Sequence, residues 1–208
     1  MADGIGVQPL LDALDGVAYL VDRPGIIRAV GTASWQRFAV ENDVPELTPA
    51  SVIGHSLFAS VDGDAVREAC RHLHDLVCLQ QRPAISYEYR CDAPGTERRM
   101  RMSISPVRRR RGATMALYQS QMMLEAARPP LGLISLGLRS AQSRRSPEAP
   151  LLAICSFCHD VAWPIGAPDA EQSWIKVEEY YRRGGTSDVA VSHGICPVCV
   201  ATIVLAAD

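Results

Sequence analysis

The sequence has little net charge and no long apolar run. Its formal charge is −2 at pH 7, so an attraction to nucleic acid or to an anionic membrane would have to come from a local patch. No stretch reaches the roughly 18 consecutive apolar residues that a membrane span needs, and the longest candidates are 131–138 and 198–207. No amino-terminal signal peptide is recognisable. We therefore expect a soluble, cytoplasmic protein that has no membrane partner.

Motifs of common catalytic sites are missing too. We find no glycine-rich phosphate loop, no nucleophile elbow and no His-Glu-x-x-His helix in the sequence, and these are the patterns that accompany phosphoryl transfer, acyl transfer and metal-assisted hydrolysis. Internal repeats and low-complexity tracts are absent as well. With 48% apolar and 21% charged residues the composition is that of a globular chain. We expect a folded protein of 208 residues that is not an enzyme.

Cysteine is the residue type that carries the strongest chemical signal. Four of the seven cysteines form two Cys-x-x-Cys pairs, Cys155 with Cys158 and Cys196 with Cys199. A two-residue gap lets both sulfurs of a pair point to one spot about 2.3 Å from a metal, and two pairs supply a tetrahedron. The odd number of cysteines speaks against a secreted disulfide framework. The spacing predicts a closed structural zinc site that leaves no position for a reactive water.

Other readings of these thiols stay open. Residues Cys155 to His159 match Cys-x-x-Cys-His, the motif for covalent haem attachment. That interpretation leaves the second cysteine pair unexplained and requires the protein to be exported. A thiol switch, in which oxidation expels the metal and forms disulfides, is compatible with zinc. His193 could replace one thiolate, but we expect it in a turn or in a hydrogen bond to a sulfur.

Elements of the first half follow from apolar periodicity and turn residues. Residues 64–81 predict a long helix, whose apolar face is Val66, Ala69, Cys70, Leu73 and Val77, with Asp64 as its cap. Before it we expect short helices and loops over 32–60. The other expected elements are a short helix at 9–14, a hairpin of strands 17–21 and 26–30, and three strands at 84–91, 96–106 and 113–122.

This order of elements and several phrases resemble the PAS domains of bacterial sensor proteins. The phrases are Asp22–Ile26, Val52–Phe58, Tyr89–Pro94 and Arg99–Met102, and the resemblance covers residues 10–122. It implies an α+β fold, with a five-stranded antiparallel sheet and helices packed on one face around a small pocket that holds a ligand, a cofactor or nothing. We assign residues 1–122 to this sensor domain.

The second half divides into a linker, 123–150, and a cysteine module, 151–208. We expect the first half of the linker to dock on a domain and the second half to be mobile. In the module we expect a helix over 171–183, ended by Gly184 and Gly185, and a terminal helix opened by Pro197. Below roughly 70 residues a metal often supplies the missing stability, which favours a small, treble-clef-like helical module that binds zinc.

The module also resembles the cysteine-rich tail found on many bacterial PAS and response-regulator proteins. The resemblance is carried by the phrases 154–158, 173–180 and 192–199, of which Ser-His-Gly-Ile-Cys-Pro-x-Cys is the most specific. In that tail a lysine-rich, acidic stretch usually follows the first cysteine pair, whereas here residues 159–164 read His-Asp-Val-Ala-Trp-Pro.

A second hypothesis for the sensor domain is a haem site. Cys70, His74 and Cys78 form one stripe on the long helix, and some PAS domains bind haem through a histidine in this part of the fold. His74 or His72 would then be one ligand, with Met100 or Met102 opposite, which makes the protein a gas or redox sensor. The plain alternative is that these histidines are partly exposed neighbours of the core and the methionines fill it.

A third hypothesis is a zinc-containing nucleic-acid-binding regulator. Arg108 to Arg111 lie at the last hairpin, near Arg98, Arg99 and Arg101 on the polar face of a strand, and such a cluster can meet phosphates. A charged run in a hairpin turn is more often a solvated surface, so nucleic acid is not the partner we expect.

The main hypothesis is a signal-sensing and interaction protein. A change in the PAS pocket would shift the docking of the linker and of the zinc module. Because we find no output enzyme in the sequence, the signal would pass to a protein partner, and we expect a homodimer.

Overall fold

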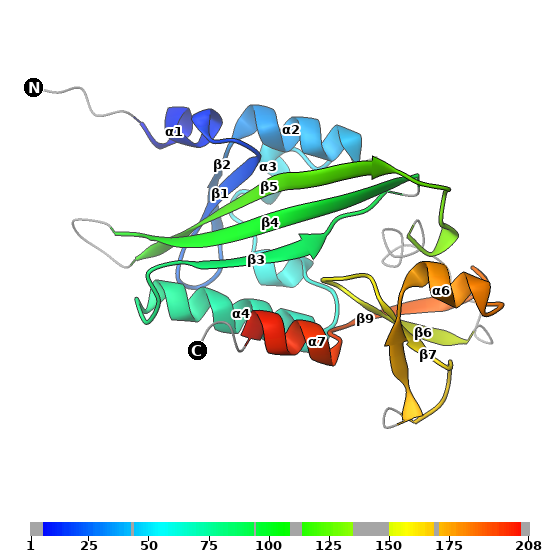
Figure 1. Cartoon of the computed structure of the whole chain (residues 1–208). Coiled ribbons are helices and arrows are strands. Elements are labelled where there is room, and N and C mark those ends of the chain that lie inside the picture. The colour runs from blue at the N-terminus through cyan, green and yellow to red at the C-terminus, as the bar shows by residue number, and fades with distance from the viewer. Residues whose placement is uncertain are drawn as a thin grey trace, which may run out of the picture.

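Two β-sheets organise the chain, and Figure 1 shows one at each end of the molecule in the computed structural model. One sheet has five strands and comes from the first two thirds of the chain, and the other has four strands and comes from the last third. The structure describes residues 6–42, 44–93, 95–108, 114–134, 150–168 and 171–204.

The first sheet is antiparallel throughout, with the strand order β2-β1-β5-β4-β3. It confirms the predicted α+β class and the five-stranded antiparallel sheet. β5 continues beyond 122, the end that we predicted, into the expected linker, because it stays paired with β4 as far as Ala127. The strands are β1 (Val17–Val21), β2 (Ile27–Val30), β3 (Ile85–Arg90), β4 (Thr96–Val107) and β5 (Met115–Ala127).

Helices cover this sheet on both faces. Tyr19 and Val21 of β1 belong to the main core, whereas Ala18 and Leu20 pack with Leu11, and alternate residues of a strand point to opposite faces. α1 (Val7–Ala13) therefore lies on the face opposite to the main core. That core is completed by residues of α2 (Thr32–Glu41), α3 (Pro49–Val52), η1 (Leu57–Ser60) and α4 (Asp64–Cys78).

The long helix α4 has the predicted apolar face, with two corrections. Its N-cap is Gly63, and the expected cap Asp64 is the first helical residue. The helix ends at Cys78 because Gln80 adopts a left-handed backbone conformation, with φ of 59°. His74 is 1% exposed, so it belongs to the core and is not the partly exposed neighbour that we expected.

The second sheet has the order β8-β7-β6-β9, and its β6 and β9 pair in parallel. The prediction of a mainly helical module was therefore wrong. Trp174 lies in strand β8, where it pairs with Ala162, so only the second half of the predicted helix 171–183 is helical. The elements are β6 (Leu151–Cys155), β7 (Val161–Trp163), β8 (Ser173–Ile175), α6 (Val177–Arg182), β9 (Ala190–Gly194), α7 (Pro197–Cys199) and the π-helical turn η3 (Val200–Val204).

Residues that follow the first sheet in the sequence pack into two different cores. Leu133 and Ile134 are 0% and 4% exposed, and Leu133 packs with the second sheet and α6. Phe157 and Ile203 belong to the main core together with residues of the first sheet. The second half of the expected linker, from 135 to 149, lies outside the described residues. Among the helices of the described ranges, none has the length and apolar character that a membrane span requires.

Candidate metal centre

The four paired cysteines meet in space. The sulfur atoms of Cys155, Cys158, Cys196 and Cys199 all lie within 4.8 Å of one another. Tetrahedral coordination with metal–sulfur bonds of about 2.3 Å separates the sulfurs by about 3.8 Å, and the Cys158 and Cys196 sulfurs lie 3.7 Å apart. The seven cysteines, all among the described residues, are free thiols. The cluster fits a metal ion that prefers four sulfur ligands.

Parallel pairing of β6 and β9 brings the two cysteine pairs together. In the register of this pair Cys155 lies beside Gly194. Because the two strands are parallel, the chain leaves both of them at the same end, toward the rest of the first cysteine pair and toward the segment before the second pair. Past Cys155 the chain turns, with the His159 amide donating to the Cys155 carbonyl at 3.0 Å. His159 completes the turn with a positive φ of 61°.

The second pair opens α7, as the sequence predicted. Cys196 is the N-cap, and its sulfur accepts a hydrogen bond from the Cys199 amide at 3.4 Å. Pro197 occupies the first helical turn, where its missing amide proton costs nothing. The Cys196 amide in turn donates to the Cys155 sulfur at 3.4 Å. Amide protons are therefore directed at sulfurs from the start of this turn, which favours thiolate charge.

The electrostatics of the cluster favour a thiolate at Cys155 and oppose one at Cys199. A hydrogen bond from the Cys158 thiol, with help from the Cys196 amide and against the effect of burial, lowers the pKa of Cys155 to about 5. Burial raises the pKa of Cys199 to about 12. Ionisation of all four thiols thus requires a compensating positive charge, and a bound cation supplies one.

Neighbouring residues fasten the cluster to the first sheet. Phe157, which lies between the first two cysteines, is 6% exposed and packs edge-on against Tyr87 of β3 at 5.7 Å between ring centroids. Its carbonyl accepts from the Arg90 amide at 2.7 Å. On the other side Cys199 and Ile203 belong to the same core as Leu73 of α4, and α7 runs alongside α4 in Figure 1.

A buried carboxylate forms a second connection between the sheets. Asp92 follows β3, and its fully buried side chain lies 2.6 Å from Arg90, 3.2 Å from Arg128 and 3.1 Å from Nδ1 of His159. The Arg98 amide donates to its other oxygen at 2.9 Å. Burial alone would raise the pKa of Asp92, but the hydrogen bonds from His159, Arg90 and Arg98 outweigh it and hold this pKa well below its usual range.

His193 does not contact a sulfur through its ring, so that prediction was wrong. Its Nδ1 lies 2.9 Å from a carboxylate oxygen of Asp62, in the loop before α4. His193 lies in β9 and not in a turn, and its ring reaches back to the segment before α4. His193 is therefore a contact between the two halves of the chain.

The residues of the haem hypothesis lie in different environments. Nδ1 of His74 lies 3.0 Å from the Tyr118 hydroxyl, and Nε2 lies 3.0 Å from the Asp22 carbonyl. Because a carbonyl only accepts, Nε2 carries the proton and Nδ1 accepts from Tyr118. His72 is exposed, Met100 is 3% exposed and Met102 is half-buried against the main core. With both nitrogens of His74 engaged, the haem site stays a prediction.

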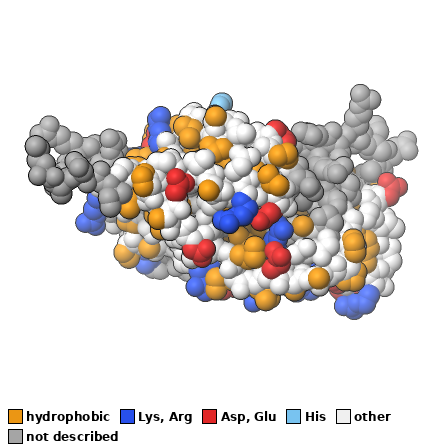
Figure 2. Space-filling model, turned by 90° about the horizontal axis from the view of Figure 1, so that it is seen from above, with side chains coloured by type: hydrophobic (Ala, Val, Ile, Leu, Met, Phe, Trp, Pro, Cys, Tyr) orange, Lys and Arg blue, Asp and Glu red, His pale blue; other side chains and the backbone are white. Residues whose placement is uncertain are grey.

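Two of the four arginines of the nucleic-acid hypothesis that the structure describes are paired, and Arg99 is exposed. Arg98 lies 3.0 Å from Glu125, and Arg101 lies 3.4 Å from Glu88. Arg108 is exposed, and Arg109 to Arg111 lie outside the described residues. Figure 2 shows basic and acidic side chains interspersed on the face that it displays. No observation here favours a phosphate-binding surface.

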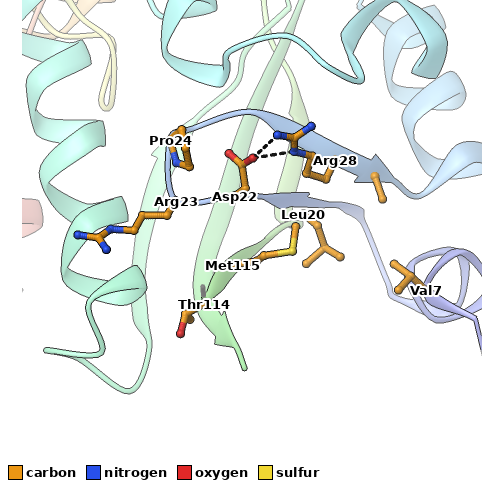
Figure 3. Close-up of a pocket in the computed structure, with 9 residues that line it drawn as sticks. Val7, Leu20, Asp22, Arg23, Pro24, Arg28, Thr114 and Met115 are labelled. Atoms are coloured by element: carbon orange, nitrogen blue, oxygen red, sulfur yellow. Dashed lines mark hydrogen bonds and ion pairs between the residues drawn. The ribbon is translucent and has the colours of Figure 1, made fainter. Parts of the chain in front are cut away.

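A groove of about 580 Å³ lies on the outside of the first hairpin. Figure 3 shows Leu20 and Met115 on one side of it and the ion pair of Asp22 with Arg28, 2.6 Å apart, on the other. Leu20 and Met115 belong to the cluster around Leu11 of α1. The groove therefore lies on the α1 side of the sheet, whereas the resemblance implied a pocket surrounded by the helices packed on one face.

Sequence reasoning missed Asp92, Arg128 and Phe157 as parts of the site. Asp92 and Arg128 are ordinary charged residues of a turn and of the expected linker, and their pairing depends on contacts distant in sequence. Phe157 gave a signal that could have been used, since an aromatic residue inside a cysteine pair, beside predicted ligands, has to be buried somewhere.

Comparison with known proteins supplies fold likenesses only. No protein-family model and no curated protein matches the sequence. Among solved structures, the PAS domain of Bordetella pertussis BvgS is 17% identical, with 56% of this chain and 83% of that chain covered and a TM-score of 0.44. The photoactive yellow protein domain of the Rhodospirillum centenum kinase Ppr is 20% identical, with 56% and 94% covered and a TM-score of 0.35.

A third solved structure is a domain of an HTR-like protein from Haloarcula marismortui. It is 14% identical, with 52% of this chain and 97% of that chain covered and a TM-score of 0.36. At such scores these likenesses carry no argument about ligand, signal or partner.

Proposed function

We propose that the chain is a signal-sensing protein, in which a PAS-like sensor domain is coupled to a structural zinc site and passes its signal to a protein partner. The observation that carries the proposal is the convergence of four cysteine sulfurs within 4.8 Å. This convergence occurs where the Cys155–Cys158 turn is hydrogen-bonded to the edge of the sensor sheet. Metal site and sensor are therefore parts of one packed structure.

Zinc is the metal that best suits these ligands. Four thiolates in a tetrahedron select zinc or iron–sulfur chemistry, and two Cys-x-x-Cys pairs that open a turn and a short helix are a common zinc arrangement. When bound, zinc supplies two positive charges and a crosslink between the two cysteine pairs. Cys155, Cys158, Cys196 and Cys199 would hold it, with the amides of Cys196 and Cys199 supporting the sulfur charge.

Coupling would run through the residues that join the cysteine turn to β3. A fixed turn holds the Phe157 ring against Tyr87 and its carbonyl at the Arg90 amide. A change in the sensor sheet at β3 would displace the same contacts. Order in one half of the chain thus stabilises order in the other half. Such coupling is what a signal needs if it is to shift the protein between two conformational states.

The proposed role is not catalytic. A site closed by four thiolates has no open position at which a metal could activate water. We therefore propose that the output is a change of surface, recognised by a protein partner, in a homodimer of this chain.

Metal analysis of the purified, reduced protein tests the proposal. We expect one zinc per chain, little iron and no visible absorption band. Cys158→Ser and Cys199→Ser are expected to lose at least half of the zinc. The matched control is Cys70→Ser, because Cys70 lies on α4, outside the cluster, and is half-buried. Full zinc content in both ligand variants, or metal-free parent protein, would refute the zinc site.

The sensor part needs a separate measurement. Hydrogen exchange of β3 amides with and without zinc tests whether the metal site is coupled to the sheet. We expect exchange at 85–90 to rise when zinc is removed. If zinc binds as predicted and hydrogen exchange of the β3 amides does not change, zinc crosslinks only the cysteine segments and the proposed coupling to the sheet is wrong.

A further inference from the structure

A small pocket lies at the junction of the two halves of the chain, and Cys155 of the cysteine cluster is among the residues that line it. Its volume is about 160 Å³. One side is formed by Arg90 and Asp92 at the end of β3, and the other by Ser156 and His159 of the cysteine turn. Ile134, from the segment between the halves, lines it as well. A molecule in this pocket would touch three separate parts of the chain.

The junction buries more positive than negative charge. The side chains of Arg90 and Arg128 are only 13% and 9% exposed, and both pair with the single fully buried carboxylate, Asp92. Glu97 lies 3.7 Å from Arg90, and Glu178 lies 3.3 Å from Arg128. These two glutamates are 34% and 43% exposed, so water screens much of their effect.

Hydrogen-bond donors are in excess too. Among the residues that the structure describes, Nε of Arg90 and Nε of Arg128 are buried and have no hydrogen-bond acceptor. Buried donors without a partner are rare in native proteins, and each one calls for a water, an ion or a ligand as its explanation. Arg90 lines the pocket itself. The pocket therefore adjoins an arginine that has unused donor capacity.

Three aliphatic side chains form much of the remaining lining, which also includes Cys91, Cys155 and His193. Leu133, Ile134 and Ile154 are 0%, 4% and 5% exposed and belong to the walls of the pocket. A bare inorganic anion would leave this wall without a partner. A ligand with one anionic end and a short hydrocarbon end matches both sides, as is usual for small-molecule sites with a few polar groups in an apolar lining.

We propose that the junction pocket binds a small aliphatic monocarboxylate. The carboxylate would pair with the Arg90 guanidinium, whose planar fork matches two oxygens, and the chain would lie against Ile134. At about 30 Å³ for each water-sized group, the volume admits about five non-hydrogen atoms, the size of propanoate. A dianion is disfavoured because Asp92 is a charged carboxylate at the same place.

This site goes beyond the proposed function: Cys155 is among its lining residues, but the contacts proposed for the ligand are with Arg90 and Ile134 and do not require the metal to be zinc. Because the ligand touches both halves of the chain, it would bind the docked arrangement more tightly than any separated one. Binding would therefore stabilise the junction.

The test is titration of the full-length, metal-loaded protein with sodium propanoate by calorimetry at constant ionic strength. We expect saturable binding with a Kd in the millimolar range or below, and at least tenfold weaker binding of propanamide, which has the same shape without the charge. Ile134→Phe, which fills the pocket, and Arg90→Gln, which removes the cation, are each expected to weaken binding at least tenfold. Arg101→Gln is the matched control, because Arg101 pairs with Glu88 on an exposed strand face.

Three outcomes would overturn the inference: no saturable binding to the parent protein, equal binding of propanamide, or parent-like binding by Ile134→Phe. The Ile134 variant decides the matter if Arg90→Gln does not fold. Metal content is measured on the same samples. Parent protein that holds its full metal content and does not bind propanoate counts against the pocket alone, and parent protein that binds propanoate but holds no zinc counts against the proposed function alone.

Discussion

The backbone amide of Arg90 donates to the carbonyl of Phe157 at 2.7 Å. Arg90 is the last residue of β3, and β3 is an edge strand of the five-stranded sheet. The turn that carries Cys155 and Cys158 thus occupies part of a free strand edge, a position that proteins usually cover or protect. The cysteine cluster is thus joined directly to the five-stranded sheet.

Removing the metal should loosen β3. Without a bound cation, charged thiolates repel one another, and neutral thiols give no crosslink, so the turn that holds Phe157 loses its anchor. We expect hydrogen exchange of the amides at 85–90 to speed up at least tenfold on chelation, and exchange in β1 to change much less. Cys155→Ser should behave as chelation does. Unchanged β3 exchange in metal-free protein would show that the turn is ordered without metal.

Phe157→Ala should cost about 3–5 kcal/mol of unfolding free energy, because the ring is almost fully buried against Tyr87. The measurement is chemical denaturation of the metal-loaded protein. Leu151→Ala is the control, since Leu151 is 55% exposed and should cost less than about 1 kcal/mol. A cost below about 1 kcal/mol for Phe157→Ala would mean that the turn is not held by this packing.

The sequence predicted the five-stranded sheet well because its signals are local. The hairpin of β1 and β2 has turn residues between two apolar runs, and the face of α4 has a helical period. The four cysteines were also found from spacing alone, since two residues between ligands suit one metal.

The second sheet and the junction could not be predicted in this way. Residues 171–175 have a pattern that suits a helix as well as a strand, and pairing of β8 with β7 decides between them. The parallel pair of β6 and β9 joins segments far apart in sequence. Asp92 gave no signal in the sequence, because its importance comes from three partners that the fold brings to it.

Asp92→Asn should destabilise the protein by about 3–5 kcal/mol, because it removes the charge that compensates two buried arginines. Denaturation of the metal-loaded protein measures the loss. Asp64→Asn is a matched control, as the Asp64 side chain is 98% exposed beside Arg67 and should change stability by less than about 1 kcal/mol. Equal effects of the two variants would contradict the assignment of Asp92 as the central group of the junction.

Gly185 and Gly184 should differ sharply when replaced by alanine. A Cβ at Gly185 would overlap the ring of Tyr180, which is 0% exposed and donates to the Thr186 carbonyl at 2.7 Å. We expect Gly185→Ala to lower unfolding free energy by about 1–3 kcal/mol or more through overpacking. At Gly184 there is open space, but φ is 86°, so Gly184→Ala should cost about 1 kcal/mol from backbone strain. Denaturation curves of both variants check the order.

His74 should make stability fall in mild acid. Burial lowers the pKa of His74, although the hydrogen bond to the Asp22 carbonyl opposes this. The unfolded chain, with a histidine pKa of about 6.5, then binds a proton before the folded chain does. The contribution to stability is therefore full above about pH 6.5 and is lost as pH falls through the lower, folded pKa, with a slope of up to about 1.4 kcal/mol per pH unit.

Comparison with His74→Gln isolates this effect, because glutamine can keep hydrogen bonds to Tyr118 and Asp22 without titrating. We expect the difference in unfolding free energy between parent and variant to be constant at pH 7–8 and to shift in favour of the variant as pH falls below about 6.5. His72→Gln, at an exposed position of the same helix, should run parallel to the parent. A parallel course for His74→Gln as well would show that His74 titrates normally. The role of His74 as a neutral core residue would then have to be abandoned.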